Sequence, residues 1–375
     1  METKAAVLYE LGKSEPFQQS KPMVIESLSL DGPGTGEILV EVVGAGLCHS
    51  DLSVINGSRP RVMPMVMGHE ASGIVQEVGK GVTDFTKDDH VVFSFVPICG
   101  RCKPCLSGRP ALCEKGAVAN VDGCLLSGHR PFKNHSGTEL HQHLGVSAFS
   151  QFTVTAQESA VKITKDIPLE KAALFGCAVM TGSGAVINTA NVSPGESVVV
   201  FGMGGVGLSA IMAAKASGAF PIIGVDMLES KFDIATQAGA HHMVKAGTDK
   251  TLDEIRELTH GGADFAIEAV GSEKVLMEAY AATGRGGTTV SIGLPHPSKE
   301  FVISATTIVA EERTIKGCYM GSSVPALDIP KFIGMYQAGI LPVDLLLSRE
   351  IKLNEINSAF DDLHSGKEIR QIIRF

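Results

Sequence analysis

A glycine-rich turn that joins a buried strand to a helix constrains the fold of this chain more than any other stretch. Residues 197–201 read Ser-Val-Val-Val-Phe, the apolar run of a buried strand, and Gly202-Met-Gly204-Gly205-Val206-Gly207 follows at once. Small residues typical of a packed helix come next, and a further apolar run, 221–225, ends at Asp226. A Gly-x-Gly-x-x-Gly turn between a strand and a helix, with an acid after the next strand, is typical of a dinucleotide-binding βαβ unit.

The chemistry of this turn predicts the cofactor. Glycines let the backbone approach a pyrophosphate at the N-terminus of a helix. Asp226 is expected to accept hydrogen bonds from the ribose hydroxyls of the adenosine and to repel a 2′-phosphate, so the sequence favours NAD over NADP. The expected contacts are Gly202, Gly204, Gly205, Val206, Gly207 and Asp226.

Strands and helices alternate along the rest of this region, and the pattern predicts a doubly wound parallel sheet of six strands. After the first two strands, the expected helices are 229–239, 251–259 and 273–282, and the expected strands are 241–245, 264–269, 287–292 and 313–319. The sequence beyond residue 324 predicts a helix at 328–338, a strand near 343–351 and a helix at 354–364.

The first part of the chain has a different character. Apolar and alternating runs at 4–9, 24–30 and 38–44 are separated by turn residues, with a clear turn cluster at 31–36. Short strands at this spacing predict a β-rich lobe. The fold class is therefore α/β, with a β-rich domain beside a doubly wound one.

Two potential metal ligands lie at the ends of these short strands. Cys48 and His69 are a thiolate and an imidazole, which suit zinc, and each has a carboxylate close by, Asp51 or Glu70. Such carboxylates commonly orient metal ligands. A third ligand has to come from elsewhere, and Cys177 in an apolar run is the best candidate. A buried thiol and a core histidine would explain the same residues, so both interpretations stay open here.

Four cysteines within fifteen residues predict a second metal site. Cys99, Cys102, Cys105 and Cys113 follow the spacing Cys-x2-Cys-x2-Cys-x7-Cys, and four thiolates close a tetrahedron around one structural zinc. A ferredoxin-type iron–sulfur cluster is the main rival, but the long last spacing and the lack of a following proline disfavour it. Unpaired thiols without a metal are the remaining alternative.

Composition excludes several classes of function. The net charge is −9, with 19% charged residues, so no basic surface favours nucleic acid. No run of eighteen apolar residues predicts a membrane span, and the N-terminal residues do not resemble a signal peptide. Eight cysteines in such a chain indicate a reducing compartment, and we expect a cytoplasmic protein. Cys124 and Cys318 have no predicted role beyond packing.

Taken together, these motifs resemble the zinc-dependent medium-chain alcohol dehydrogenases over nearly the whole chain. The resemblance rests on Cys48-His-Ser-Asp51, Gly68-His69-Glu70, the four cysteines, Gly176-Cys177 with Thr181-Gly182, the glycine turn with Asp226, and the tail 364–370. It implies a GroES-like catalytic domain at 1–178, completed by 321–375, and an NAD-binding Rossmann domain at 179–320. The active cleft would lie where the two meet.

The resemblance also implies roles for single residues. Cys48, His69 and Cys177 would ligate a catalytic zinc, with Glu70 and Asp51 behind them, and Ser50 would take the proton of the alcohol. The cofactor would be contacted by His49, Thr181, Lys231, Ile292 and Arg370 besides the glycine turn. Phe95, His143, Leu294 and Tyr319 would line the substrate pocket. Many relatives carry a histidine where this chain has Ser53, so the proton relay would end in water or be slower.

The expected reaction is hydride transfer from a primary alcohol, with aromatic alcohols among the expected substrates, to NAD, giving the aldehyde, with two zinc ions per chain. One alternative is the glutathione-dependent formaldehyde branch, which uses an arginine where this chain has Ala117 and Val118, the nearest base being Lys115. A cofactor that stays bound and needs an external acceptor is another. A non-catalytic dinucleotide-binding protein on the same fold is a third, although such relatives tend to have lost the zinc ligands. A homodimer or homotetramer is expected.

Overall fold

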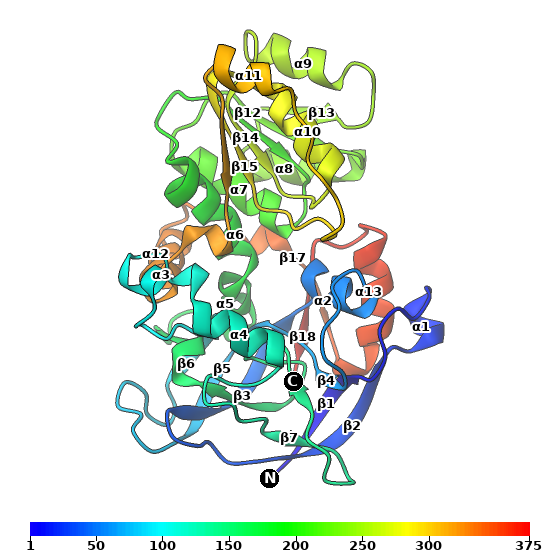
Figure 1. Cartoon of the computed structure of the whole chain (residues 1–375), viewed down its shortest axis with the longest axis vertical. Coiled ribbons are helices and arrows are strands. Elements are labelled where there is room, and N and C mark those ends of the chain that lie inside the picture. Colours follow the sequence, from blue (N-terminus) through cyan, green and yellow to red (C-terminus); the bar gives the residue numbers. More distant parts are fainter. The chain divides into compact units, whose positions relative to one another are not determined.

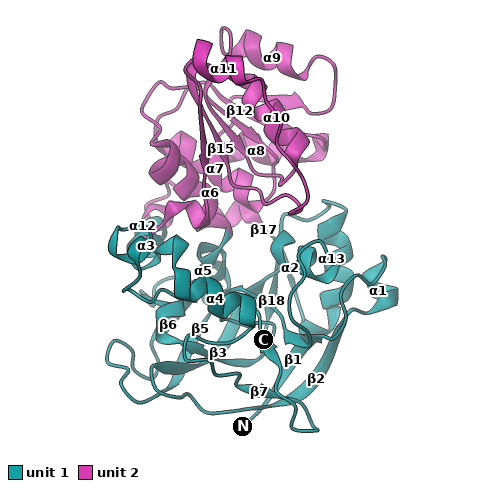
Figure 2. Ribbon diagram, viewed as in Figure 1, with its two compact units in different colours: residues 1–177, 324–333, 347–375 teal, residues 178–323, 334–346 magenta.

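The computed structural model describes residues 1–375, which divide into two compact units (Figure 2). The first unit comprises 1–177, 324–333 and 347–375, and the second comprises 178–323 and 334–346. The predicted domain ranges differ from these units chiefly in that residues 334–346 pack with the second unit. Those domain ranges stay a prediction.

The first unit holds two β-sheets built from both ends of the chain. One sheet has the order β7-β2-β1-β4-β8, and the other has the order β10-β6-β5-β3-β18-β17, with β9 also paired to β3. The C-terminal strand β18 pairs antiparallel with β3, so the red and blue ends of the chain lie in the same unit (Figure 1). The first sheet comprises β1 (Glu2–Leu8), β2 (Met23–Leu30), β4 (Met65–Val66), β7 (Phe132–Lys133) and β8 (His141–Gln142). The second comprises β3 (Glu37–Gly46), β5 (Glu70–Val78), β6 (His90–Phe93), β9 (Phe152–Ala156), β10 (Ala160–Ile163), β17 (Leu347–Ile351) and β18 (Arg370–Arg374).

Short helices connect these strands, and their apolar side chains close the core of the unit. That core joins Leu52 and Ile55 of α2 to Phe360 of α13 and to Val40 of β3, all nearly or fully buried. The helices are α1 (Phe17–Ser20), α2 (His49–Ile55), α3 (Lys103–Leu106), α4 (Glu114–Asp122), α5 (Leu169–Ala172) and α13 (Ile356–His364), and the 3-10 turns are η1 (Pro110–Leu112), η2 (Gln157–Ser159), η3 (Ala173–Gly176) and η8 (Leu353–Glu355). Helix α12 (Pro325–Gln337) has residues in both units.

The second unit contains the predicted parallel sheet of six strands, in the order β13-β12-β11-β14-β15-β16. Its strands are β11 (Val198–Phe201), β12 (Ile222–Asp226), β13 (His242–Lys245), β14 (Ala263–Glu268), β15 (Thr283–Ser291) and β16 (Thr314–Gly317). Its helices are α6 (Ala178–Gly184), α7 (Gly205–Ala216), α8 (Phe232–Ala238), α9 (Thr251–Leu258), α10 (Glu273–Ala282) and α11 (Ala305–Ala310), with a π-helix η4 (Ala185–Ala190) and the turns η5 (Glu229–Lys231), η6 (Met320–Ser322) and η7 (Val343–Leu346). The chain order reverses between β11 and β14, which is the edge where doubly wound sheets bind ligands.

One predicted strand is wrong in part. Residues 343–346 form a 3-10 turn rather than the start of a strand, and β17 begins at Leu347. Pro342 accounts for this, because its ring fixes φ and its carbonyl accepts the amide of Leu345, which closes a turn.

No single helix is long and apolar enough to cross a membrane. One bent pair, 169–176 with 178–190, meets that test by length and composition only.

Candidate metal and cofactor sites

Cys48, His69, Glu70 and Cys177 converge inside the first unit, although 129 residues separate the first from the last. Cys48 precedes α2, His69 and Glu70 stand at the start of β5, and Cys177 follows η3. One ligand atom from each lies within 4.8 Å of the others, and all four residues are buried. The structure therefore brings the predicted catalytic ligands together.

The donor set of this cluster fits zinc. Two Zn–S bonds of about 2.3 Å at a tetrahedral angle place the sulfurs about 3.8 Å apart, and the Sγ atoms of Cys48 and Cys177 lie 4.0 Å apart. Both carboxylate oxygens of Glu70 are buried without a hydrogen-bond partner. Two buried sulfurs and an imidazole, beside a carboxylate that accepts no hydrogen bond, are a set that a metal ion satisfies.

The two sulfurs differ in their proton affinity. The hydrogen bond with Cys177 holds the pKa of Cys48 well below its ordinary value, and the Arg370 guanidinium adds to this against the effect of burial. The same bond and burial raise the pKa of Cys177 well above its ordinary value. The nearby guanidinium and the second sulfur thus favour a thiolate in this pair, which is the form that ligates a cation.

Asp51 orients the imidazole of His69. The Nδ1 atom of His69 lies 3.0 Å from Oδ1 of Asp51, and both side chains are fully buried. Burial alone would lower the pKa of His69, but the carboxylate outweighs it and the pKa lies well above its ordinary value. With Nδ1 engaged, Nε2 is the nitrogen left for a metal. The other oxygen of Asp51 accepts the amide of Cys48 at 3.3 Å, which caps α2.

Arg370 is a partner of this cluster that the sequence did not suggest. It is 2% exposed, its Nε lies 3.2 Å from Oε1 of Glu70, and its two Nη atoms donate to Leu47 O at 3.2 Å and to Cys48 Sγ at 3.5 Å. Burial raises the pKa of Glu70 to about 7, against the pull of Arg370. The expected contact of Arg370 with the cofactor stays a prediction.

His143 and Phe95 stand beside His69 with their rings nearly perpendicular to it. The ring centroids lie 5.6 Å and 5.4 Å from that of His69. His143 is 1% exposed, and its Nδ1 is 3.2 Å from the Asp51 oxygen that His69 also contacts. The expected place of both residues in a substrate pocket stays a prediction, and for His143 the structure shows burial against Asp51.

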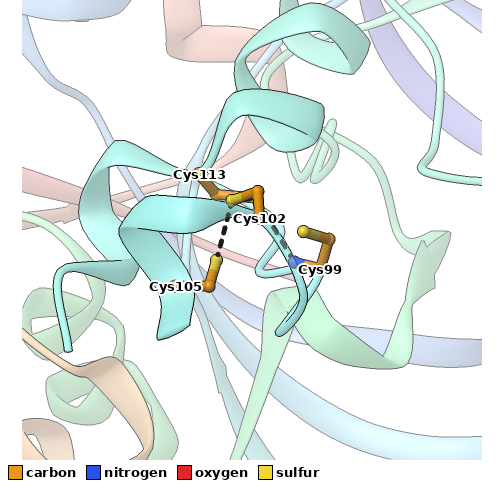
Figure 3. Close-up of side chains that lie close together, drawn as sticks. All are labelled: Cys99, Cys102, Cys105 and Cys113. Carbon is orange, nitrogen blue, oxygen red and sulfur yellow. Dashed lines mark hydrogen bonds between the residues drawn. The ribbon is translucent and has the colours of Figure 1, made fainter. Parts of the chain in front are cut away.

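The four-cysteine site forms as the spacing predicts (Figure 3). The four sulfurs lie within 4.8 Å of one another, and the Cys102 sulfur is 3.4 Å from that of Cys105 and 4.0 Å from that of Cys113. Backbone hydrogen bonds, the one from Cys105 foremost, lower the pKa of Cys102 to about 6, whereas burial raises the pKa of Cys105 to about 12. The low pKa of Cys102 favours thiolate, which is the form that ligates a metal.

The glycine turn of the second unit has the geometry that a pyrophosphate needs. Gly202 has a φ of +93°, which favours glycine, and a Cβ on Gly207 would lie 1.7 Å from Gly202 O. A Cβ on Gly204 would meet nothing within 4 Å, so open space lies beside the turn at the start of α7. In a dinucleotide turn, one glycine allows the helix to pack closely on the strand and another leaves the backbone open to the pyrophosphate. The tight packing at Gly207 and the open space at Gly204 match these two roles.

Asp226 stands at the end of β12 beside this turn. Its carboxylate accepts the amides of Met203 at 2.7 Å and Leu228 at 2.8 Å, and Lys231 Nζ lies 3.8 Å away. Each carboxylate oxygen has a further lone pair, so the side chain can still accept ribose hydroxyls.

Comparisons with known proteins agree with this geometry. Residues 34–165 match the alcohol dehydrogenase GroES-like domain and residues 205–338 match the zinc-binding dehydrogenase domain. A Mycobacterium tuberculosis protein named as an alcohol dehydrogenase is 41% identical over 378 residues, with 100% of both chains covered. The chain belongs to the zinc-dependent medium-chain alcohol dehydrogenase family.

Two further matches are proteins whose names state a more specific activity. The NDMA-dependent alcohol dehydrogenase of Amycolatopsis methanolica is 40% identical, with 100% of this chain and 99% of that one covered. The crystal structure of benzyl alcohol dehydrogenase from Acinetobacter calcoaceticus matches with a TM-score of 0.93 at 34% identity, covering 100% of this chain and 99% of that one. As a member of this family, the chain is an oxidoreductase related to the zinc-type alcohol dehydrogenases. It has a GroES-like domain and a Rossmann domain.

The remaining residues that the family resemblance singles out belong to both units. His49 is exposed and Ser50 half-buried on the first turn of α2, and the Ser53 hydroxyl donates to His49 O at 2.8 Å. In the second unit, Thr181 is half-buried in α6 and Ile292 is 8% exposed after β15. Leu294 and Tyr319 also belong to the second unit, and Leu294 is 49% exposed. The roles of these residues stay predictions.

Proposed function

We propose that this dehydrogenase transfers hydride from a primary alcohol to NAD, giving the aldehyde, and catalyses the reverse reaction. The observation that carries the proposal is the convergence of Cys48, His69 and Cys177 in one buried cluster. Three protein ligands leave one position of a tetrahedral zinc open for an alcohol, which is the mark of a catalytic site. The four-cysteine site would hold a second, structural zinc.

The residues of the cluster divide the work. Cys48, His69 and Cys177 would hold the ion, which supplies Lewis acidity at the alcohol oxygen. Asp51 engages Nδ1 of His69, so Nε2 would be the nitrogen that holds the ion, and Arg370 balances the charge of Glu70 and Cys48. Ser50 would receive the proton of the alcohol. The Ser53 hydroxyl is committed to the backbone of α2, so the proton passes from Ser50 to water rather than through residue 53.

NAD would be held by the glycine turn of the second unit and would accept the hydride at its nicotinamide. Asp226 supports the choice of NAD, because its carboxylate would repel a 2′-phosphate. His49, Thr181, Lys231, Ile292 and Arg370 are proposed as further cofactor contacts on the family resemblance.

An aromatic primary alcohol is the proposed substrate class. Two observations support it: Phe95 lies edge-on against His69, and the chain is 34% identical to a benzyl alcohol dehydrogenase. The 40% identity to an NDMA-dependent enzyme supports a second candidate, in which NAD stays bound and an external acceptor regenerates it.

A homo-oligomer in the cytoplasm completes the proposal. None of the eight cysteines forms a disulfide, as is usual in a reducing compartment. Strand β16 ends the parallel sheet with all four residues exposed, and Val302 and Val309 nearby are 69% and 80% exposed. An exposed strand edge with apolar neighbours is suited to pairing with another copy of the chain. Light scattering after gel filtration measures this directly.

The reaction is tested with a panel of aliphatic and aromatic alcohols and NAD, followed at the NADH absorbance. Parallel assays with glutathione plus formaldehyde, and with NDMA in place of free NAD, separate the alternatives. We expect benzylic alcohols to give the highest kcat/KM, and C48S to abolish turnover because one of three ligands is lost. Full activity of C48S after complete loss of its zinc would contradict the assignment.

A further inference from the structure

We propose that His143 is a positioning residue of the catalytic metal site, which shares the Asp51 carboxylate with His69 and thereby fixes the imidazole that would ligate zinc. This inference rests on the proposed function, since it assigns a second support to the same metal ligand. It differs from the role that the family resemblance implies for this position, which is to line the substrate pocket.

The geometry around Asp51 is the first argument. Its Oδ1 atom lies 3.0 Å from Nδ1 of His69 and 3.2 Å from Nδ1 of His143, and all three side chains are buried. The Nδ1 of His143 makes no hydrogen bond of full geometry, and the Asp51 oxygen at 3.2 Å is its ion-pair contact. A buried imidazole N–H without a partner costs about 1–3 kcal/mol in general, so the nearby carboxylate oxygen is the acceptor that accounts for its position.

The backbone that carries His143 is held in an unusual shape. Leu144, Gly145 and Ser147 all have a positive φ, of 53°, 68° and 51°. The Ser147 hydroxyl accepts the amide of His143 at 2.8 Å and donates to Val66 O at 2.8 Å. Residues in this region of φ need surroundings that over-determine them, and such strain gathers at functional sites. This turn fixes the imidazole of His143 at the carboxylate.

Packing supports the same conclusion. The ring of His143 stands at 87° to that of His69, with the centroids 5.6 Å apart. The ring of Phe95 stands at 85° to the same His69 ring. His69 is thus held by two perpendicular rings and by Asp51, while Asp51 is held by two imidazoles and the amide of Cys48. Outer partners of metal ligands of this kind change metal affinity by about 10- to 100-fold when they are removed.

Two variants at His143 separate the hydrogen-bond donor from the ring. H143F keeps an aromatic ring beside His69 but has no donor, and H143N keeps a donor near the position of Nδ1 but has no ring. H135N, at an exposed histidine of the same segment, is the matched control. Zinc content is measured first, and then the rate of zinc release to a chromogenic chelator and the absorption spectrum of the cobalt-substituted protein.

We expect two zinc ions per wild-type chain, of which the faster-released one depends on Cys48. H143F should release that ion about tenfold faster or more and shift the cobalt spectrum, while H143N and H135N should stay near the wild type. Unchanged release and an unchanged spectrum in H143F, with two zinc ions in the wild type, would overturn this inference alone. Equal loss in H143F and H143N would overturn it too, because the donor that H143N keeps would then not protect the ion.

Two controls keep the outcomes distinct. If H143F does not fold, S147A takes its place, because it removes the hydroxyl that holds the backbone of His143; it should also release the catalytic zinc faster, and unchanged release would overturn the inference. A wild-type protein whose only metal is bound by the four cysteines would overturn the proposed function, and the inference with it.

Discussion

At the residue scale, a buried ion pair lies beside the cluster of metal ligands. Glu70 and Arg370 are both nearly fully buried, although glutamate and arginine are rarely buried in proteins unless they are paired. Their ion pair also reaches Cys48, so it connects the C-terminal strand β18 to the metal cluster. Removing one partner of such a pair leaves an uncompensated charge, which costs more than removing both.

A double-mutant cycle measures this coupling. We expect R370M to lower the free energy of unfolding by about 3–5 kcal/mol and E70Q/R370M to lower it by less, because the double variant no longer leaves the Glu70 carboxylate uncompensated. Urea unfolding of the metal-free proteins provides the values. Equal destabilisation in the single and the double variant would show that Arg370 acts through packing alone.

Glu268 makes a further residue-scale prediction, which concerns pH. It ends β14, and its carboxylate accepts the amides of Val270 at 2.7 Å and Gly271 at 2.6 Å, yet burial raises its pKa. The folded protein therefore binds more protons than the unfolded chain, whose carboxyl has a pKa of about 4.3. Stability from this group is full below that pH and is lost as the pH rises through the folded pKa.

E268Q removes this dependence while its amide oxygen still accepts both backbone amides. We expect the melting temperature of E268Q relative to the wild type to increase between pH 5 and pH 8. E268L, which leaves both amides without an acceptor, should be less stable by about 2–3 kcal/mol at either pH. If the difference in melting temperature between E268Q and the wild type did not change with pH, the Glu268 carboxyl would not be the source of this pH dependence.

At the scale of elements, the turn between β11 and α7 combines two demands. Gly207 must lie against the carbonyl of Gly202, whereas the position of Gly204 is open. We expect G207A to destabilise the second unit, and G204A to fold like the wild type but bind NADH at least about tenfold more weakly, because its methyl group occupies the pyrophosphate's place. Thermal unfolding and NADH fluorescence titration separate the two. NADH binding by G204A at wild-type affinity would argue against a dinucleotide at this turn.

The four-cysteine segment is an element that has little core of its own. Cys99, Cys102 and Cys105 are only half-buried, and α3 contains no buried residue. A structural zinc of this kind supplies folding free energy directly. C105S should therefore expose residues 96–125 to limited proteolysis and speed their hydrogen exchange, with β11–β16 unaffected. Protection of that segment equal to the wild type would contradict a structural metal.

At the scale of the whole molecule, the order of motifs along the chain predicted the fold. The alternation of strands and helices after Ser197 predicted six parallel strands, and the two strands beside the glycine turn, β11 and β12, are buried throughout and read as nearly continuous apolar runs. The spacing of four cysteines predicted their convergence, since ligands so close in sequence need only one loop to meet.

Contacts between distant residues were beyond the reach of such patterns. Arg370 and Glu70 are 300 residues apart, and no period or spacing relates them. His143 could be named as a site residue only through the family resemblance. Its approach to Asp51 depends on a turn with three positive φ angles, and a segment with a single glycine does not predict such a turn. The short turn at 343–346 was missed because Pro342 outweighed an apolar run.

Alcohol oxidation at this site requires that Cys48, His69 and Cys177 bind one zinc ion. Anomalous diffraction from crystals of the purified protein, collected on both sides of the zinc absorption edge, tests this claim most directly. We expect two peaks per chain, one bonded to these three side chains and one inside the four cysteines. A single peak at the four cysteines, with the other three side chains bonded to nothing, would contradict it.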